Sequence, residues 1–197
     1  MTLADKVTTI RVILSPIFFI LYLAPEFFPS VPGLQAPWTV IVLWLIFIIS
    51  EITDLLDGRI ARGRNEVSDF GKLYDPFADV LVRVTYFLCF VITGILPVVL
   101  LLIVLYREFG ILFLRVLMMK KGLALGARKG GKLKAVTYML TGIVALLAVS
   151  IKRMELGNTL FTIFRNSATV LFIISTIISV LSFVDYIAVY RRTGKES

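Results

Sequence analysis

The sequence predicts an all-α membrane protein, built as a bundle of six membrane-spanning helices with a short amphipathic helix at the N-terminus. Hydrophobic residues make up 58% of the 197 residues, and the mean hydropathy is +0.93. A soluble domain of this length is about 45–50% apolar, so lipid is the simplest solvent for the excess. The apolar residues also occur in long runs without the alternation of a β-barrel. The length suits one domain spanning residues 1–197.

Each apolar run is close to the roughly 20 residues that a helix needs to cross a bilayer. Helices are expected because hydrocarbon offers no partners for backbone polar groups. Before the first run, residues 2–11 predict a short amphipathic helix on the membrane surface. The six predicted spans are 12–28, 38–57, 75–94, 97–117, 134–151 and 167–190.

The basic residues predict an orientation in the membrane. Of the 21 Lys and Arg, 17 lie near the two termini or the second-to-third and fourth-to-fifth connections. The opposite side holds only Lys152, Arg153 and Arg165, and Arg83 lies within a span. The positive-inside rule then places both termini in the cytoplasm and the protein in the cell inner membrane. The net charge of +8 therefore indicates orientation rather than a nucleic-acid partner.

Four aspartates predict a metal site at the cytoplasmic ends of two spans. Asp54 and Asp57 are three residues apart, and Asp75 and Asp79 are four apart, so each pair shares one helix face. The short connection predicts antiparallel neighbours whose four carboxylates converge. Such like charges repel in a low-dielectric setting, and divalent cations relieve the repulsion. With no histidine in the chain, these oxygen ligands favour Mg²⁺ or Mn²⁺, as two ions.

The aspartates also allow two other interpretations. Each aspartate alone could be a solvated helix end, although four in register make that weak. A divalent-cation transporter is the alternative from another functional class. Transporters hold their charged sites near the bilayer midplane, whereas these aspartates lie at helix ends beside basic residues. That position favours a metal-dependent enzyme with an anionic substrate.

A second cluster predicts a phosphate site. Arg107 and Arg115 are eight residues apart and share a helix face, and Lys132 and Lys134 begin the next span. These four side chains could clamp a dianionic phosphate. The alternative is that they only anchor helices at anionic lipid headgroups.

The aspartates belong to a longer spaced pattern, which resembles the signature of the CDP-alcohol phosphotransferase family. The pattern contains small residues and an arginine as well as the four carboxylates. In chain order it consists of Asp54, Asp57, Gly58, Ala61, Arg62, Gly71, Asp75 and Asp79. The six-span architecture is also similar to that family, so the resemblance covers most of the chain.

The resemblance implies roles for these residues. It implies that the aspartates hold metal against the diphosphate of a CDP-linked donor, with Asp79 also acting as general base. It implies that CMP leaves when an alcohol oxygen attacks the β-phosphorus, and that the protein is a homodimer. The residues implied to bind the nucleotide are Gly58, Ala61, Arg62 and Gly71.

The acceptor is indicated by a second resemblance. The segment around Arg107, Glu108 and Arg115, with the following Lys132 and Lys134, resembles phosphatidylglycerophosphate synthases. This implies CDP-diacylglycerol as donor and glycerol 3-phosphate as acceptor, both used at the membrane lipid surface. Inositol phosphate, phosphatidylglycerol and serine remain alternative acceptors.

One departure from that subgroup concerns the position after the last aspartate of the signature. Val80 stands where these synthases usually have lysine, and Arg83 follows one turn later. Arg83 would replace the lysine as a counter-charge or contact the acceptor phosphate.

Overall fold

The computed structural model describes residues 3–34, 36–64, 69–120 and 129–193. All regular elements in these ranges are helical. They are α1 (Leu3–Phe27), the 3-10 helix η1 (Pro32–Leu34), α2 (Pro37–Arg64), α3 (Asp69–Ile92), α4 (Val98–Lys120), α5 (Lys129–Arg153) and α6 (Asn158–Thr193). Within these ranges, the side chains outside the description are those of residues 3–4, 32, 55–64, 69–70, 72, 129 and 192–193.

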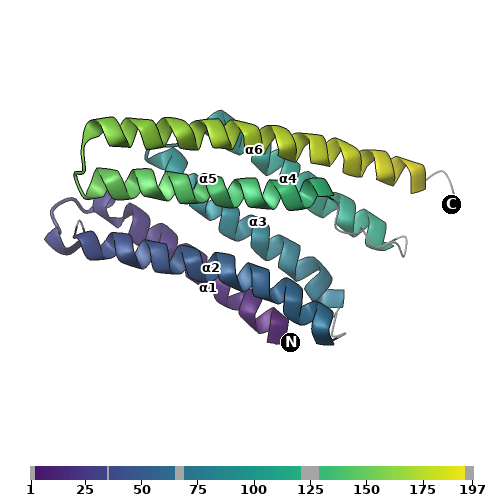
Figure 1. Ribbon diagram of the computed structural model, residues 1–197. Helices are drawn as coiled ribbons and strands as arrows, with labels where there is room; N and C mark the ends of the chain where they lie inside the picture. Colours follow the sequence, from purple (N-terminus) through teal and green to yellow (C-terminus); the bar gives the residue numbers. More distant parts are fainter. Residues whose placement is uncertain (1–2, 35, 65–68, 121–128, 194–197) are drawn as a thin grey trace.

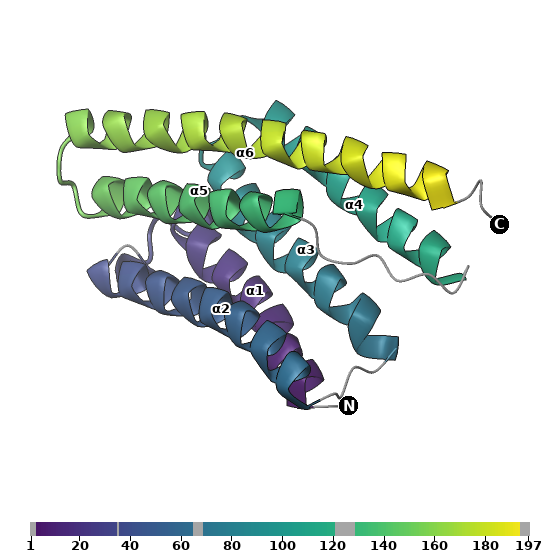
Figure 2. The same ribbon diagram turned by 45° about the vertical axis from the view of Figure 1, so that its right-hand side comes forward.

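The helices run along a common direction as a bundle, with the start of α1 and the end of α6 at the same end (Figures 1 and 2). α1 packs against both α2 and α3, α5 packs along α6, and α4 lies between α3 and α6. Local sequence explains the connections: α2 begins at Pro37, where a missing N–H costs nothing, and the left-handed Gly94 (φ 73°) follows α3.

An aromatic core ties the helices together around α3. Tyr86 of α3 contacts Phe18 of α1 and Phe47 of α2, with ring centroids 4.5 and 5.3 Å apart. Phe87, the next residue, contacts Tyr138 of α5 and Phe172 of α6 at 5.3 and 4.8 Å. Because successive residues on a helix point in different directions, these two rings join opposite halves of the bundle through α3.

The outer surface is apolar, as expected for a protein surrounded by lipid. Large hydrophobic side chains are exposed on all six α-helices, for example Ile20, Phe113 and Leu181, each more than 60% exposed. A soluble monomer rarely exposes so much continuous apolar surface. Four segments of the described helices are long and apolar enough to span a membrane: Asp5–Phe27, Pro37–Asp54, Gly130–Arg153 and Asn158–Arg191. The chain is therefore an all-α membrane protein.

The expectation of six equivalent spans needs correction at α3 and α4, which are not among those four segments. Both helices carry several charged residues within their apolar stretches: Asp75, Asp79 and Arg83 on α3, and Arg107, Glu108 and Arg115 on α4. These side chains line the interior of the bundle, where they contribute to the candidate site described below.

The predicted surface helix at residues 2–11 is wrong as a separate element. Residues from Leu3 onward belong to α1, which continues without a break to Phe27. Asp5, Thr8 and Arg11 are buried rather than facing water. The physical reason is that the polar residues of this stretch pair with polar residues of α2 and α3, so they are satisfied inside the bundle.

The relation predicted for the second and third spans also involves α1. The prediction is that α2 and α3 are antiparallel neighbours that bring their aspartates together. α1 contacts each of these helices more extensively than they contact one another. Asp54 of α2 and Asp79 of α3 still interact directly, and a residue of α1 binds both of them.

The approach of α2 to α5 yields a prediction about stability. A Cβ atom added at Gly142 of α5 would lie 2.9 Å from ring atoms of the buried Phe47. We expect Gly142→Ala to lower the free energy of unfolding by about 1–3 kcal/mol through overpacking, measured as a lower Tm in detergent. The loss should be smaller in a Phe47→Leu background.

The control is Leu140→Val, at an exposed position on the same helix. Alanine favours a helix over glycine by about 1 kcal/mol. A higher Tm for Gly142→Ala in both backgrounds would therefore show that helix propensity, not the contact with Phe47, decides the effect.

Candidate functional site

Arg11 of α1 brings two of the predicted aspartates together. Its Nη1 atom donates hydrogen bonds to Asp54 Oδ1 of α2 at 2.6 Å and to Asp79 Oδ1 of α3 at 2.8 Å. The Arg11 side chain is 3% exposed. Because one nitrogen atom binds both carboxylates, their oxygens converge on a single point between three helices.

Asp75 lies one turn before Asp79 on α3 and is held by a different residue of α1. Thr8 Oγ1 donates a hydrogen bond to Asp75 Oδ1 at 2.9 Å. Thr8 and Arg11 are three residues apart and so share a helix face. The same face of α1 therefore orients both aspartates of α3.

The other residues of the predicted signature are only partly described. Gly71 is buried near the start of α3. Asp57, Gly58, Ala61 and Arg62 belong to α2, but their side chains lie outside the described residues. Convergence of all four carboxylates thus stays a prediction. Among the described side chains, no three acidic or cysteine groups form a complete metal-binding cluster.

The described residues nevertheless suit a divalent cation. Asp54 and Asp79 form a point where two anionic oxygens meet, and the positive charge there comes from Arg11. Arg83 adds a second positive charge, with its Nη2 atom 3.9 Å from Asp54 Oδ2. Carboxylate oxygens are the ligands that Mg²⁺ and Mn²⁺ prefer. The chemistry of this donor set therefore fits the predicted metal.

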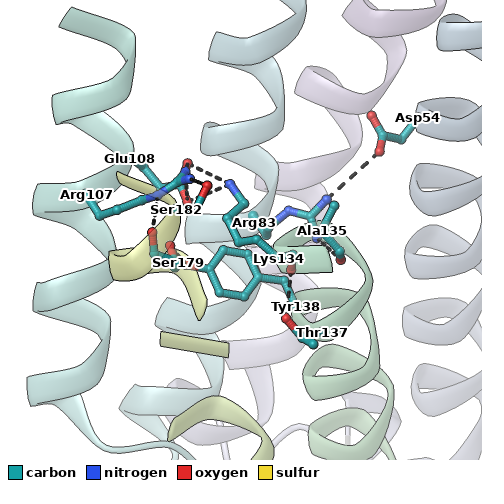
Figure 3. Close-up of polar contacts among 10 residues, drawn as sticks. All are labelled: Asp54, Arg83, Arg107, Glu108, Lys134, Ala135, Thr137, Tyr138, Ser179 and Ser182. Atoms are coloured by element: carbon teal, nitrogen blue, oxygen red, sulfur yellow. Dashed lines mark hydrogen bonds and ion pairs between the residues drawn. The ribbon is translucent and has the colours of Figure 1, made fainter. Parts of the chain in front are cut away.

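A second polar cluster lies where α4, α5 and α6 meet (Figure 3). Glu108 accepts hydrogen bonds from Arg107 Nη1 at 3.0 Å and from Lys134 Nζ at 2.8 Å. Tyr138 lies beneath the ammonium group, with its ring centroid 5.1 Å from Nζ. Figure 3 shows Arg83 between this cluster and Asp54, so its positive charge lies between the two groups.

A cavity of about 260 Å³ joins the two clusters. Its walls come from α3, α4, α5 and α6, and Asp79, whose side chain is 40% exposed, lies in it. The basic residues that line it are Arg83, Arg107, Arg115, Lys132 and Lys134. The four basic residues singled out in the sequence thus share one cavity with the predicted general base.

The two arginines of α4 differ in how their donors are used. Arg107 is 4% exposed, and its guanidinium also donates to Ser179 O at 3.1 Å and to Ser182 Oγ at 3.4 Å of α6. Among the residues that the structure describes, Arg115 Nε is buried without a hydrogen-bond partner. A buried donor without an acceptor is costly. Arg115 is therefore better placed than Arg107 to bind an anion entering the cavity.

Sequence reasoning assigned no site role to Arg11 or Glu108. Both are ionisable residues within apolar helices, which is itself a signal of a functional or paired position. That signal does not reveal the partner: Arg11 pairs with residues 43 and 68 positions away, and Glu108 pairs with one 26 positions away.

The sequence is similar to known proteins. The chain matches the family model of CDP-alcohol phosphatidyltransferases over residues 1–181. It is 36% identical over 195 residues to a CDP-diacylglycerol–glycerol-3-phosphate 3-phosphatidyltransferase of Treponema pallidum (strain Nichols), covering 96% of this chain and 89% of that protein.

Two further relatives match shorter regions. A protein of the same name from Bacillus subtilis (strain 168) is 34% identical over 134 residues, 67% of this chain and 69% of the relative. A cardiolipin synthase (CMP-forming) of Streptomyces coelicolor is 39% identical over 112 residues, 53% of this chain and 48% of the relative. With a family match that spans nearly the whole sequence, this membrane protein belongs to the CDP-alcohol phosphatidyltransferase family.

Proposed function

We propose that this transferase moves a phosphatidyl group from CDP-diacylglycerol to a hydroxyl of glycerol 3-phosphate and releases CMP. The observation that carries the proposal is the shared cavity, in which Asp79 lies beside five basic side chains. An acceptor with a hydroxyl and a phosphate matches this pairing of a carboxylate with a cationic wall. The names of the Treponema and Bacillus relatives support the same donor and acceptor.

The acceptor phosphate would bind Arg115, Lys132 and Arg83. Glu108 neutralises part of the charge of Arg107 and Lys134 and holds both side chains. Arg115 keeps an unused buried donor, and Lys132 is exposed. Arginine and lysine donors bind phosphate through charge-assisted hydrogen bonds. Arg107 and Lys134 would then contribute chiefly by shaping this wall and by their positive charge.

Asp79 would act as the general base. The acceptor hydroxyl loses its proton to the Asp79 carboxylate as its oxygen attacks the β-phosphorus of the donor. The bond from that phosphorus to the oxygen of CMP breaks, and CMP leaves. Arg11 holds Asp79 by a 2.8 Å hydrogen bond, which fixes the position of the carboxylate.

Asp54, Asp57, Asp75 and Asp79 would hold the divalent cations, proposed as two Mg²⁺ or Mn²⁺ ions. Such ions supply positive charge that offsets the donor diphosphate and the departing CMP. Gly58, Ala61, Arg62 and Gly71 would bind the cytidine nucleotide, as the family signature implies. Gly71 is buried at the start of α3, two turns before Asp79.

The start of α1 and the end of α6 lie at one end of the bundle (Figure 1), and Asp54 and Asp79 contact Arg11 near the start of α1. Most basic residues flank this end in the sequence, so the proposal places it in the cytoplasm of an inner-membrane protein. α3 and α4 would complete six spans by keeping their charged residues inside the bundle. A homodimer and a single domain over residues 1–197 are part of the same proposal.

Phosphatidylglycerol is the second candidate acceptor, because the Streptomyces relative is named a cardiolipin synthase. The deciding experiment measures CMP release by the purified full chain with CDP-diacylglycerol and each acceptor in turn. We expect glycerol 3-phosphate to react faster than phosphatidylglycerol, inositol phosphate or serine, and excess EDTA to stop the reaction until Mg²⁺ is restored. Metal uptake into liposomes without CMP release would favour a transporter instead.

Asp79→Asn should abolish turnover while CDP-diacylglycerol binding remains measurable, because the amide cannot take the acceptor proton but the other aspartates stay in place. Turnover is measured as CMP release and binding by titration in detergent. Asp185→Asn, an exposed position on α6 that does not line the cavity, serves as the matched control. Loss of donor binding in Asp79→Asn would assign this residue mainly to metal binding.

Arg115→Lys should raise the KM for glycerol 3-phosphate about tenfold to a hundredfold, because one charge-assisted hydrogen bond to phosphate is worth roughly 1.5–3 kcal/mol. The KM for CDP-diacylglycerol and the Tm should change little. Arg107→Lys, by contrast, should lower the Tm, because Arg107 donates a hydrogen bond to Ser179 O of α6. Lys120→Gln, at an exposed position of α4, is the control. Equal increases in both KM values for Arg115→Lys would contradict a specific acceptor contact.

A further inference from the structure

A second cavity, of about 450 Å³, lies at the end of the bundle opposite to the aspartates. The ends of α1, α3 and α5 form its walls, and Tyr22, Thr93 and Arg153 are among its lining residues. Two of the apolar segments able to span a membrane end here, at Phe27 and at Arg153, and another begins at Asn158. The cavity is therefore at the level where hydrocarbon gives way to lipid headgroups on this side.

Exposed aromatic residues support that placement. Phe27, Phe28 and Trp38 are each between 47% and 67% exposed and flank the connection from α1 to α2. Aromatic side chains, Trp and Tyr in particular, collect at the boundary between hydrocarbon and water. The opening of the cavity is thus within reach of the headgroups of the surrounding lipids.

Arg153 supplies a cationic donor that no described residue of this cavity accepts. Its Nη2 atom donates a hydrogen bond to the backbone oxygen of Tyr22. Its guanidinium carbon is 5.2 Å from the centroid of the Tyr22 ring. Its Nη1 atom is buried, and among the described residues it has no hydrogen-bond partner and Arg153 forms no ion pair. The guanidinium is thus held in position with one donor left for an external acceptor.

The charges around Arg153 limit what that acceptor can be. Lys152 adds a second positive charge, and Glu26 and Glu155 add two negative charges at exposed positions of the same cavity. The four formal charges cancel, so the cavity has no excess positive charge to balance a doubly charged anion. A singly charged anion is the better match. This balance suits the phosphodiester of a lipid, with one negative charge, better than a dianionic phosphate monoester.

We propose that this cavity binds the phosphodiester headgroup of a membrane phospholipid, with Arg153 Nη1 and Lys152 as donors to its phosphate oxygens. The lipid would come from the leaflet opposite to the aspartate site. Binding there would join the ends of α1, α3 and α5. The inference is independent of the acceptor chosen for the transferase reaction, because no residue of this cavity lines the cavity that contains Asp79.

The test uses the purified full chain in a neutral detergent without phosphate groups. Dioleoyl phosphatidylethanolamine is added, because it carries a phosphodiester and is not a reactant of the proposed transfer. We expect it to raise the Tm of the unmodified chain more than dioleoylglycerol, which lacks phosphate, or inorganic phosphate. Arg153→Gln should remove most of this increase and Lys152→Gln part of it.

Arg165→Gln is the matched control, since Arg165 is an exposed basic residue of α6 that does not line the cavity. Its lipid-induced increase in Tm should equal that of the unmodified chain, and all folded variants should retain CMP release. An unchanged lipid effect in both Arg153→Gln and Lys152→Gln would overturn the proposal. If Arg153→Gln does not fold, Lys152→Gln decides alone.

The measurements with dioleoylglycerol and with inorganic phosphate identify the part of the lipid that is bound. An equal increase with dioleoylglycerol would show that acyl chains, not the phosphodiester, cause the stabilisation, and would also overturn the proposal. An equal increase with inorganic phosphate would overturn the lipid as the source and assign the cavity to a free anion.

Discussion

The arrangement of the candidate site depends on one interaction, the hydrogen bonding of Arg11 to Asp54 and Asp79. Carboxylates inside a membrane protein repel each other and lose hydration, so they need a positive charge close by. Arg11 supplies it from α1, and thereby draws α2 and α3 toward the same helix. The same ion pairs thus hold both aspartates against α1.

The rest of the bundle separates charge from lipid. The outer faces of the helices expose apolar side chains, whereas α3 and α4 turn their charged residues toward the interior. Without a hydrophobic force between helices in lipid, close packing and interior polar contacts must hold them together. The rings around Tyr86 and Phe87 provide that packing, and hydrogen bonds such as that of Tyr138 to Ser179 (2.8 Å) join α5 to α6.

Glu108 shows how one acidic residue organises a basic cavity. Several cations lining a small space would repel each other if none were neutralised. Glu108 binds Arg107 and Lys134 and so fixes two of them against α6 and Tyr138. The cationic character of the cavity is retained by Arg83, Arg115 and Lys132. This division between cations that Glu108 binds and cations that it does not bind is a property of the folded bundle, in which α4 and α5 meet.

The sequence by itself determined the helical membrane class and the family, and it predicted which residues are chemically active. Apolar runs of spanning length, the eight-residue signature from Asp54 to Asp79 and the basic residues after Tyr106 are local patterns, and local patterns are readable from the chain. Only the tertiary structure decided that residues 3–11 belong to a long helix that packs into the bundle, and that Arg11 joins Asp54 to Asp79. It also decided that Arg107 hydrogen-bonds to α6, whereas Arg115 Nε has no hydrogen-bond partner among the described residues. The physical reason is that these contacts join residues dozens of positions apart, and helical periodicity fixes the face on which a side chain lies but not the helix that will pack against it.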